Sequence, residues 1–226
     1  MKQPLSRELI VSEALRQLAR EGFEGMSLRK IALALDTGPA SLYAYVDDLE
    51  SLQALVVDRA LASVDVSGGR RRGFRDRLKA VLESYVRVLI DTRGLARLAA
   101  GSIPVGPSAL RVIEALLGLL DEGGVDQATA AWAVDLLVLY VTSIAAEQSQ
   151  GHNPADPEGP IARAVLGASP EDFPRVRAAG RELLAGDGEQ RFSWAIDVLL
   201  NGMLASPRPK TPKRAASRKP APSSCT

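Results

Sequence analysis

The stretch ALDTGPASLYAYV, residues 34–46, ends one apolar helix and starts another within a few residues. The tripeptide DTG at 36–38 interrupts the helical pattern, and Pro39 suits the first position of a new helix because its ring fixes a helical φ. The apolar residues before the break share one helix face through their i, i+3, i+4 and i+7 spacing: Leu28, Ile31, Ala32 and Leu35. Two helices joined by so tight a turn predict a helix-turn-helix, whose second helix enters the major groove of DNA.

Helix-start signals flank this unit on both sides. Ser6, Ser27 and the pair Asp47-Asp48 each precede an apolar run of helical period, and short polar side chains of this kind cap helix N-termini. The sequence therefore predicts a three-helix unit followed by a leucine-rich fourth helix, with the short recognition helix third in order.

Helical periodicity continues after the Gly- and Arg-rich stretch DVSGGRRRG at 65–73. No strand-like alternation persists, and the apolar spacing predicts seven further helices: roughly 74–91, 93–101, 107–122, 126–149, 160–167, 171–185 and 188–205. We therefore predict an all-α chain in three parts. These are a helix-turn-helix DNA-binding domain at 1–62, a helical ligand-binding and dimerisation domain at 63–205, and a disordered basic, proline-rich tail at 206–226, which lacks apolar periodicity.

The charge of the chain is unevenly distributed. The net charge is +1, and the tail at 206–226 holds six basic side chains and no acidic one, which leaves −5 for the rest (1 − 6). Any affinity for DNA must therefore come from local patches or from the tail. The single cysteine, Cys225, excludes an internal disulfide, and the N-terminus shows no apolar run of signal-peptide length; both favour a cytoplasmic location.

The apolar stretch at 128–146 approaches the length of a membrane span. Asp135 interrupts it, and neither an aromatic belt nor a basic flank frames it, so a buried core helix is the better interpretation and we expect no membrane partner. An enzyme is also disfavoured. With His152 as the only histidine and no metal-ligand cluster, phosphate loop or triad, the sequence predicts no catalytic residues, no metal site and no cofactor.

The segment REGFEGMSLRKIALALDTGPASLYAYVDDLESLQAL, residues 20–55, strongly resembles the DNA-binding domain of the tetracycline-repressor (TetR) family of bacterial regulators. The shared features are a Gly-Phe before the second helix, a Ser-hydrophobe-Arg at its start, an Ile-Ala in its middle and a Leu-Tyr in the recognition helix. The resemblance implies DNA contacts at nine positions: Ser27, Arg29, Thr37, Gly38, Pro39, Ala40, Ser41, Tyr43 and Tyr45. It also implies a homodimer on a palindromic operator and an apolar cavity for an unidentified small effector.

The last predicted helix, within DGEQRFSWAIDVLLNGMLA, is similar to the helix that forms the dimer in many members of the family. Its apolar stripe has the spacing of a helix-bundle interface and gives the expected dimer contacts: Phe192, Ala195, Ile196, Leu199, Leu200 and Met203. Upstream, Trp132, Tyr140 and Trp194 are expected in the core or the dimer, whereas Asp135 faces a cavity, water or a partner arginine.

One alternative to a repressor stays open. Residues 1–60 carry seven basic and nine acidic side chains, a net of −2, and Leu49 occupies a position where relatives hold phosphate with a lysine. Asp36 also stands where the family usually turns the chain with glycine. A protein-interaction module that keeps the fold with weak or lost operator binding would have the same features.

Overall fold

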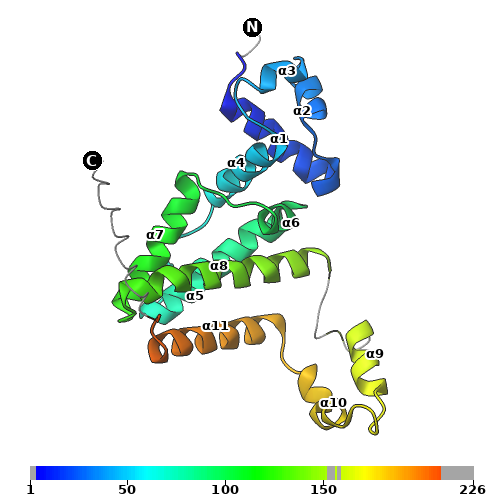
Figure 1. The fold of residues 1–226 in the computed structure, drawn as a ribbon, viewed down its shortest axis with the longest axis vertical. Coiled ribbons are helices and arrows are strands. Elements are labelled where there is room, and N and C mark those ends of the chain that lie inside the picture. Colours follow the sequence, from blue (N-terminus) through cyan, green and yellow to red (C-terminus); the bar gives the residue numbers. More distant parts are fainter. Residues whose placement is uncertain (1–3, 152–155, 157–158, 210–226) are drawn as a thin grey trace, which may run out of the picture.

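The computed structural model describes residues 4–151, 156 and 159–209, and within these ranges the regular structure is entirely helical (Figure 1). The predicted all-α fold is therefore confirmed. His152 and most of the predicted tail, residues 210–226, lie outside the described residues.

The N-terminal helices gather at one end of the molecule (Figure 1). They comprise α1 (Arg7–Glu21), the 3₁₀ turn η1 (Phe23–Gly25), α2 (Leu28–Ala34), α3 (Pro39–Leu42) and α4 (Leu49–Leu61). The three predicted caps are confirmed, since the side chains of Ser6, Ser27 and Asp48 accept the backbone N–H groups of Leu9, Lys30 and Ser51. Each cap of this kind stabilises a helix by about 1 kcal/mol.

Four helices form the body of the molecule beneath this unit: α5 (Phe74–Asp91), α6 (Leu95–Ala100), α7 (Pro107–Glu122) and α8 (Gln127–Ser149). α8 packs against the other three, and α4 reaches down from the N-terminal unit to contact α5, α6 and α7. Fully buried leucines and valines fill the space between them, as the apolar spacing predicted. The core is continuous from α1 to α8, so the two predicted domains share it.

The remaining helices are α9 (Pro160–Gly167), α10 (Pro174–Ala179), the 3₁₀ turn η2 (Gly180–Leu183) and α11 (Gly188–Ala205). α11 runs beside α8 and also contacts α5, where Lys79 Nζ lies 2.7 Å from an Asp197 carboxylate oxygen and 2.9 Å from Ser193 Oγ. The unit of α9, α10 and η2 lies at the opposite end from α3 (Figure 1).

α8 is the one helix of the described residues long and apolar enough, by length and composition, to cross a membrane. Its inner face packs against α5, α6 and α7, which is how a core helix of a globular domain is buried.

The C-terminal segment after α11 returns to the first turn of α8. There the Arg208 N–H donates to Thr129 Oγ1 at 2.8 Å, and its guanidinium lies 4.9 Å from the centre of the Trp132 ring.

Candidate nucleic-acid interface and ligand cavity

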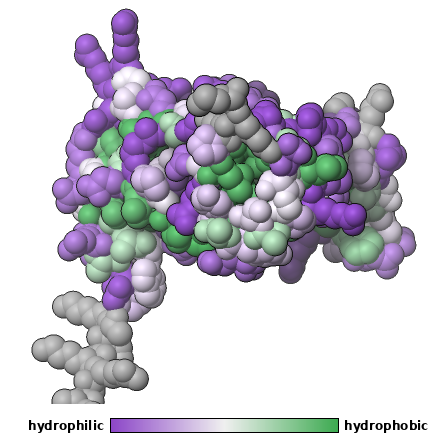
Figure 2. Space-filling view, turned by 90° about the horizontal axis from the view of Figure 1, so that it is seen from above, coloured by the Kyte–Doolittle hydropathy of each residue, from purple (hydrophilic) through white to green (hydrophobic). Residues whose placement is uncertain are grey.

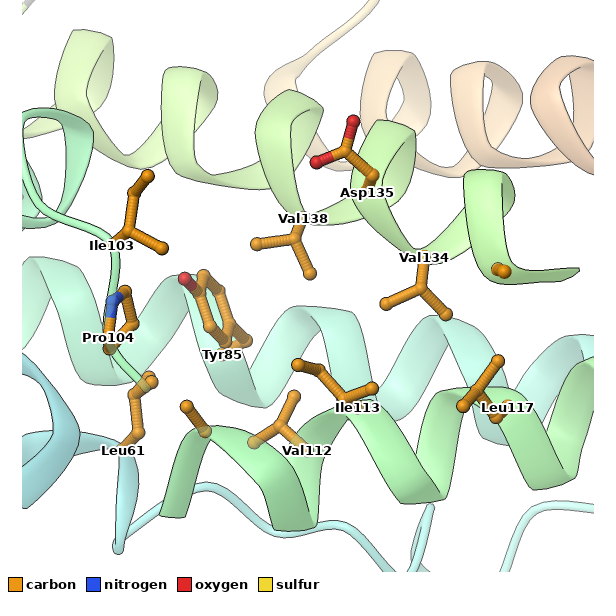
Figure 3. A pocket seen from close by; sticks show the side chains of 12 residues that line it. Leu61, Tyr85, Ile103, Pro104, Val112, Ile113, Leu117, Val134, Asp135 and Val138 are labelled. Atoms are coloured by element: carbon orange, nitrogen blue, oxygen red, sulfur yellow. The ribbon is translucent and has the colours of Figure 1, made fainter. Parts of the chain in front are cut away.

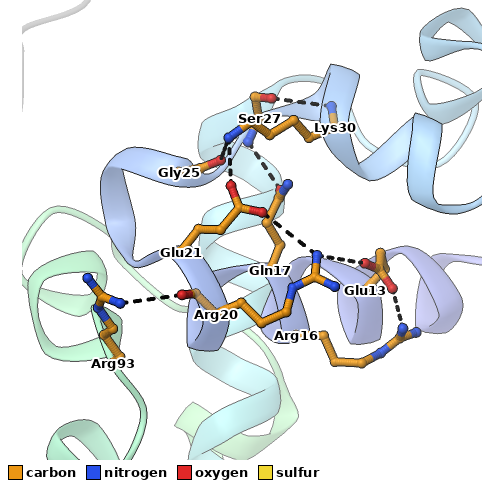
Figure 4. Close-up of polar contacts among 9 residues, drawn as sticks. All are labelled: Glu13, Arg16, Gln17, Arg20, Glu21, Gly25, Ser27, Lys30 and Arg93. Carbon is orange, nitrogen blue, oxygen red and sulfur yellow. Dashed lines mark hydrogen bonds and ion pairs between the residues drawn. The ribbon is translucent and has the colours of Figure 1, made fainter.

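The start of α2 is fixed by polar contacts to α1 (Figure 4). The Ser27 N–H donates to the buried side-chain oxygen of Gln17 at 3.3 Å, and the Ser27 hydroxyl accepts the Lys30 N–H. Lys30 turns its ammonium back to Glu21, 2.6 Å away, and this hydrogen bond lowers the pKa of the Glu21 carboxyl. Arg29 is exposed beside this network. Both adjacent cations at 29 and 30 are exposed, but Lys30 is paired with Glu21 of α1.

The turn between α2 and α3 closes on a residue in the left-handed region. Asp36 has φ 51°, and it is the only non-glycine residue with positive φ among those described. The Asp36 N–H donates to Leu33 O at 3.1 Å and the Thr37 N–H donates to Ala32 O at 3.0 Å. These two bonds form a Schellman motif, which usually carries glycine at this position. Asp36 makes this turn without glycine, because a short polar side chain tolerates the left-handed region better than most.

The recognition helix α3 presents small side chains to solvent. Its predicted start at Pro39 is confirmed, and its N-cap Gly38 supplies no side-chain hydrogen bond. Leu42 anchors the helix in the core, whereas the other predicted contact residues of this helix start are exposed: Gly38, Pro39, Ala40 and Ser41. A helix anchored by one buried leucine and lined outward by small residues can approach a groove closely. Figure 2 views the molecule from the end at which these N-terminal helices lie, and hydrophilic residues dominate the rim of that face.

The two tyrosines at the end of α3 differ. Tyr43 is 57% exposed, so its ring lies mostly in solvent. Tyr45 is half-buried, its hydroxyl donates to Leu5 O at 2.9 Å, and its own carbonyl accepts from Arg7 Nε at 3.1 Å. Tyr45 thus ties the end of the recognition helix to the start of α1, and its hydroxyl proton is used within the chain.

Acidic residues follow the recognition helix. Asp47 and Glu50 are exposed, and Asp48 caps α4, where the Ser51 N–H lowers the pKa of its carboxyl. Leu49 is half-buried and packs against the core. Leu49, where the family resemblance would place a phosphate-binding lysine, therefore serves packing in this chain.

A cavity of about 370 Å³ lies in the body of the molecule, between α4, α5, α7 and α8 (Figure 3). Its lining is almost wholly apolar and comes from these helices and the α6–α7 loop: Leu61, Tyr85, Ile103, Pro104, Ala109, Val112, Ile113, Leu117, Ala131, Val134, Asp135 and Val138. A cavity of this size suits a small organic molecule. Sequence patterns could not locate it, because its walls come from four separate segments.

Two polar groups border the cavity. Tyr85 is buried, which raises the pKa of its hydroxyl, and that hydroxyl lies 3.1 Å from Thr142 Oγ1. Asp135 lines the cavity from α8, but the residue is exposed and its carboxylate points away from the side chains of α7 (Figure 3). The cavity therefore offers one buried hydroxyl pair and an acidic group at its edge to a mostly apolar ligand.

Two residues behind the cavity wall were missed by sequence reasoning. Asp58 of α4 is buried and accepts the Ala109 N–H of α7 at 2.8 Å. Arg111 of α7 donates to carbonyl oxygens at the end of α4. A signal for Asp58 existed, because it interrupts an otherwise apolar helix face, but the sequence alone does not identify its partner.

The predicted dimer stripe on α11 has a different role in this structure. Phe192, Ile196, Leu200 and Met203 are buried in the core of the single chain, so these four assignments to the dimer surface are corrected. They face α5 and α8, because an apolar stripe of helical spacing packs first against the nearest apolar helices. Ala195 and Leu199 are half-buried at the edge of this contact, and their dimer role stays a prediction.

A second apolar face on the same two helices is exposed. It comprises large side chains of α8 and α11 with exposed fractions of 41–69%: Trp132, Leu136, Leu139, Trp194, Val198 and Leu204. We refer to these six residues as the outer face. α8 and α11 contact each other, and exposed apolar patches mark interaction sites in soluble proteins.

Two family models match the chain. Residues 10–48 match the model described as bacterial regulatory proteins, tetR family, and residues 69–206 match the tetracyclin repressor-like C-terminal domain. The second match alone spans more than half of the 226 residues.

Known proteins agree with these models. The chain is similar over 91% of its length to an HTH-type transcriptional regulator of Saccharopolyspora erythraea, which it matches at 28% identity over 87% of that protein. Among solved structures, a candidate transcription regulator from Streptomyces superposes with a TM-score of 0.80 at 38% identity, covering 93% of this chain and all of that one.

A second solved structure carries a ligand. The TetR family protein ActR of Streptomyces coelicolor, in complex with actinorhodin, superposes with a TM-score of 0.76 at 31% identity, covering 90% of this chain and 98% of ActR. The matched relatives are transcriptional regulators, and the matched families indicate no enzyme.

Proposed function

Since this chain belongs to the TetR family of bacterial transcriptional regulators, we propose that it is a ligand-responsive repressor that binds a palindromic operator as a homodimer. Its DNA-binding surface is the exposed start of α3 together with the start of α2, and its effector site is the cavity between α4, α5, α7 and α8. It acts in the cytoplasm, where its DNA partner lies, and it needs no cofactor.

The observation that carries this proposal is the exposed start of α3. The helix turns Ala40, Ser41 and Tyr43 to solvent while Leu42 holds it to the core, which is the arrangement that a recognition helix needs. Arg29, exposed at the start of α2, is placed to contact a guanine or a phosphate. We assign the remaining contacts to Ser27, Thr37, Gly38, Pro39 and the backbone beside Tyr45.

The homodimer is supported by the outer face of α8 and α11. A twofold axis beside these helices would bury that face in a four-helix interface and place two copies of α3 in successive major grooves, about 34–36 Å apart. Ala195 and Leu199 then lie at the border of the interface. The dimer would supply the affinity that the acidic N-terminal domain lacks as a monomer.

The apolar lining of the cavity supports an effector of matching chemistry. ActR, at 31% identity, has been solved in complex with actinorhodin. We propose that this chain binds a small, mainly apolar molecule in its cavity. A ligand that binds the DNA-free state of the dimer more tightly than the DNA-bound state would release the operator.

A second candidate function is a protein-interaction module of the same fold. Asp47, Asp48 and Glu50 beside the recognition helix, with Leu49 in place of a phosphate-binding lysine, favour it, because acidic side chains repel phosphate. The two functions predict opposite salt dependence. Operator binding weakens steeply as salt rises, since counterions are released from phosphate, and protein binding does not follow this slope.

The deciding experiment is a selection on genomic DNA. Purified full-length protein is mixed with sheared DNA of its host, and the bound fragments are sequenced at several salt concentrations. A palindromic motif among the bound fragments, with recovery that falls steeply as salt rises, supports the repressor. Uniform recovery at low salt only, lost when residues 206–226 are removed, would instead assign DNA binding to the tail and refute the proposed role of α3.

A further inference from the structure

Helices α4 and α7 cap each other, and this pair of contacts lies directly behind the wall of the cavity. We propose that Asp58 and Arg111 are positioning residues that couple occupancy of the cavity to the placement of the recognition helix. The inference rests on the proposed function, because it names the residues through which an effector would act.

The N-terminus of α7 has no cap from its own sequence. Its N-cap residue is Gly106, which has no side chain, and Pro107 follows at the first helical position. Asp58 of α4 fills this role: its Oδ1 accepts the Ala109 N–H at 2.8 Å in a buried setting. A carboxylate at this place satisfies an unpaired N–H group and interacts favourably with the helix dipole. The start of α7 is therefore held by a side chain of α4.

Gly106 is part of the same contact. A Cβ atom at this position would overlap the Asp58 carboxylate. The φ of Gly106 is −83°, so backbone conformation does not require glycine here and the close approach of Asp58 does. Any side chain at 106 would displace the carboxylate from the α7 N-terminus.

The C-terminus of α4 is held in turn by α7. Arg111 Nη2 lies 2.8 Å from Ala62 O, 3.2 Å from Leu61 O and 3.3 Å from Val64 O. Leu61 and Ala62 end α4 and Val64 follows it; Leu61 O also accepts the Val64 N–H, and past the helix end these carbonyls have no further turn of helix to bond. A guanidinium with several donors can serve them together. Each helix thus supplies the cap that the other lacks, so the two cannot slide past one another without breaking both contacts.

The cavity shares residues with these caps. Leu61 supplies a carbonyl to Arg111 and its side chain lines the cavity, and Ala109 supplies its N–H to Asp58 and also lines the cavity. A ligand that displaces either side chain therefore moves a backbone group engaged in a cap. The ligand does not need to touch Asp58 or Arg111 to act on them.

α4 also connects to the recognition helix. It begins at Leu49, a few residues after α3 ends at Leu42, and the connecting Val46 is buried in the same core as Leu52 and Val56 of α4. A shift of α4 relative to α7 would therefore move α3 relative to the body of the protomer. In a dimer the body is fixed by the partner, so the shift would alter the spacing between the two copies of α3.

The test measures how far a cavity ligand weakens operator binding. Nile red, a neutral aromatic dye, is the cavity probe, and Val112→Trp, which fills the cavity, checks that the dye binds there. Operator affinity is measured by fluorescence anisotropy with and without saturating dye, on the operator found by genomic selection. In the parent protein we expect the dye to weaken operator binding about tenfold, within the range usual for coupled sites. We call the factor by which saturating dye weakens operator binding the coupling ratio. In Asp58→Ala and Arg111→Gln we expect the coupling ratio to fall to about one, while operator and dye each still bind.

Conservative and control variants separate coupling from general destabilisation. Asp58→Asn keeps an oxygen acceptor, so its coupling ratio should stay close to that of the parent. Gly106→Ala should lower the coupling ratio to about one, although neither charged residue is changed. The matched controls lie in and before α11, where Asp187 caps that helix and Arg191 donates to the carbonyls of Leu183, Ala185 and Gly186. Asp187→Ala and Arg191→Gln remove comparable caps away from the cavity and should leave the ratio at its parent value.

The inference would be overturned if the coupling ratio equalled that of the parent in all three variants, Asp58→Ala, Arg111→Gln and Gly106→Ala. The proposed function would then remain intact. If Nile red does not bind the parent cavity, hydrogen exchange with and without operator decides instead. The inference requires operator binding to change the exchange rates of the Ala109–Val112 amides in the parent and not in the variants. Exchange rates in the parent that do not respond to operator would refute it. Absence of any specific operator would refute the proposed function itself.

Discussion

Tyr43 and Tyr45 stand two positions apart at the end of the recognition helix, yet their surroundings are opposite. Tyr43 projects into solvent, whereas Tyr45 is half-buried and bonded to the start of α1. Arg29 and Lys30 differ in the same way, since Lys30 is held by Glu21 and Gly25 O while Arg29 faces outward. Within each pair, one side chain thus contacts the rest of the domain and the other faces solvent on the proposed DNA surface.

Removal of an outward residue should weaken the operator complex. We expect Arg29→Ala and Tyr43→Ala each to cost about 1–3 kcal/mol of operator binding, because each side chain is exposed on the proposed DNA surface. Binding is measured by anisotropy at fixed salt, with gel filtration as the control for an intact dimer. Parent-like affinity in both variants would mean that the recognition surface lies elsewhere.

Tyr45→Phe should affect the fold more than the DNA complex. The variant loses the hydrogen bond to Leu5 O, and the expected loss is about 1 kcal/mol of unfolding free energy. Thermal denaturation measures this loss, and operator affinity at a temperature well below the transition should change little. A large loss of affinity with no loss of stability would instead make the hydroxyl a DNA contact.

At the scale of elements, α8 and α11 each have two apolar faces with different purposes. The inner face of α11 packs on α5 and α8, whereas Leu139, Trp194 and Val198 of the outer face are exposed. Helical spacing predicts that a stripe exists but does not say which neighbour it meets. Phe192, Ile196, Leu200 and Met203 have the spacing of a dimer stripe, yet they lie in the core of the single chain.

Mutations on the two faces should separate dimerisation from stability. Leu139→Glu and Val198→Glu place charges on the outer face and should dissociate the dimer, measured by analytical ultracentrifugation, with a folded monomer by circular dichroism. Phe192→Ala, on the inner face, should lower the unfolding free energy by about 3–5 kcal/mol through the cavity it leaves, with the dimer retained at low temperature. Dimers in both outer-face variants would place the interface on another surface.

At the scale of the whole molecule, exposed carboxylates at several helix ends are stabilised in the folded state by hydrogen bonds. The pKa of Glu21 is lowered by the Lys30 hydrogen bond, that of Asp48 by the Ser51 N–H, and that of Asp126 by the Thr129 hydroxyl. A carboxyl whose folded pKa lies below its unfolded value contributes stability above the unfolded pKa and loses it as the pH falls through the folded pKa. The ordinary values are 4.5 for glutamate and 3.8 for aspartate.

The melting temperature should therefore respond to acid in one direction. We expect it to stay level from about pH 8 to pH 5 and to fall progressively below that, as these carboxyls take up protons. Scanning calorimetry across this range measures the effect, and Glu21→Gln should show a smaller acid-induced decrease than the parent. A melting temperature that rises on acidification below pH 4.5 would contradict the assigned direction of these pKa shifts.

Local signals determined the elements of this protein. The caps at Ser6, Ser27 and Asp48 and the proline start at Pro39 act within one turn of helix, so the sequence alone predicts them, and the helix ends observed at Asp91, Glu122 and Ala205 coincide with the predicted ends. The family resemblance at residues 20–55 depends on the same local pattern. It is therefore confirmed together with the helix-turn-helix.

Tertiary structure alone decided what depends on distant partners. Three features join residues that lie about 50 positions apart or more. They are the burial of one face of α11, the cavity formed by four helices, and the contacts of Asp58 with Ala109 and of Arg111 with Leu61. A periodic pattern records that a side chain is apolar or that a helix end lacks a cap, but it does not record the partner. The partner is fixed only when the helices pack, because burial and hydrogen bonding depend on which surfaces meet in space.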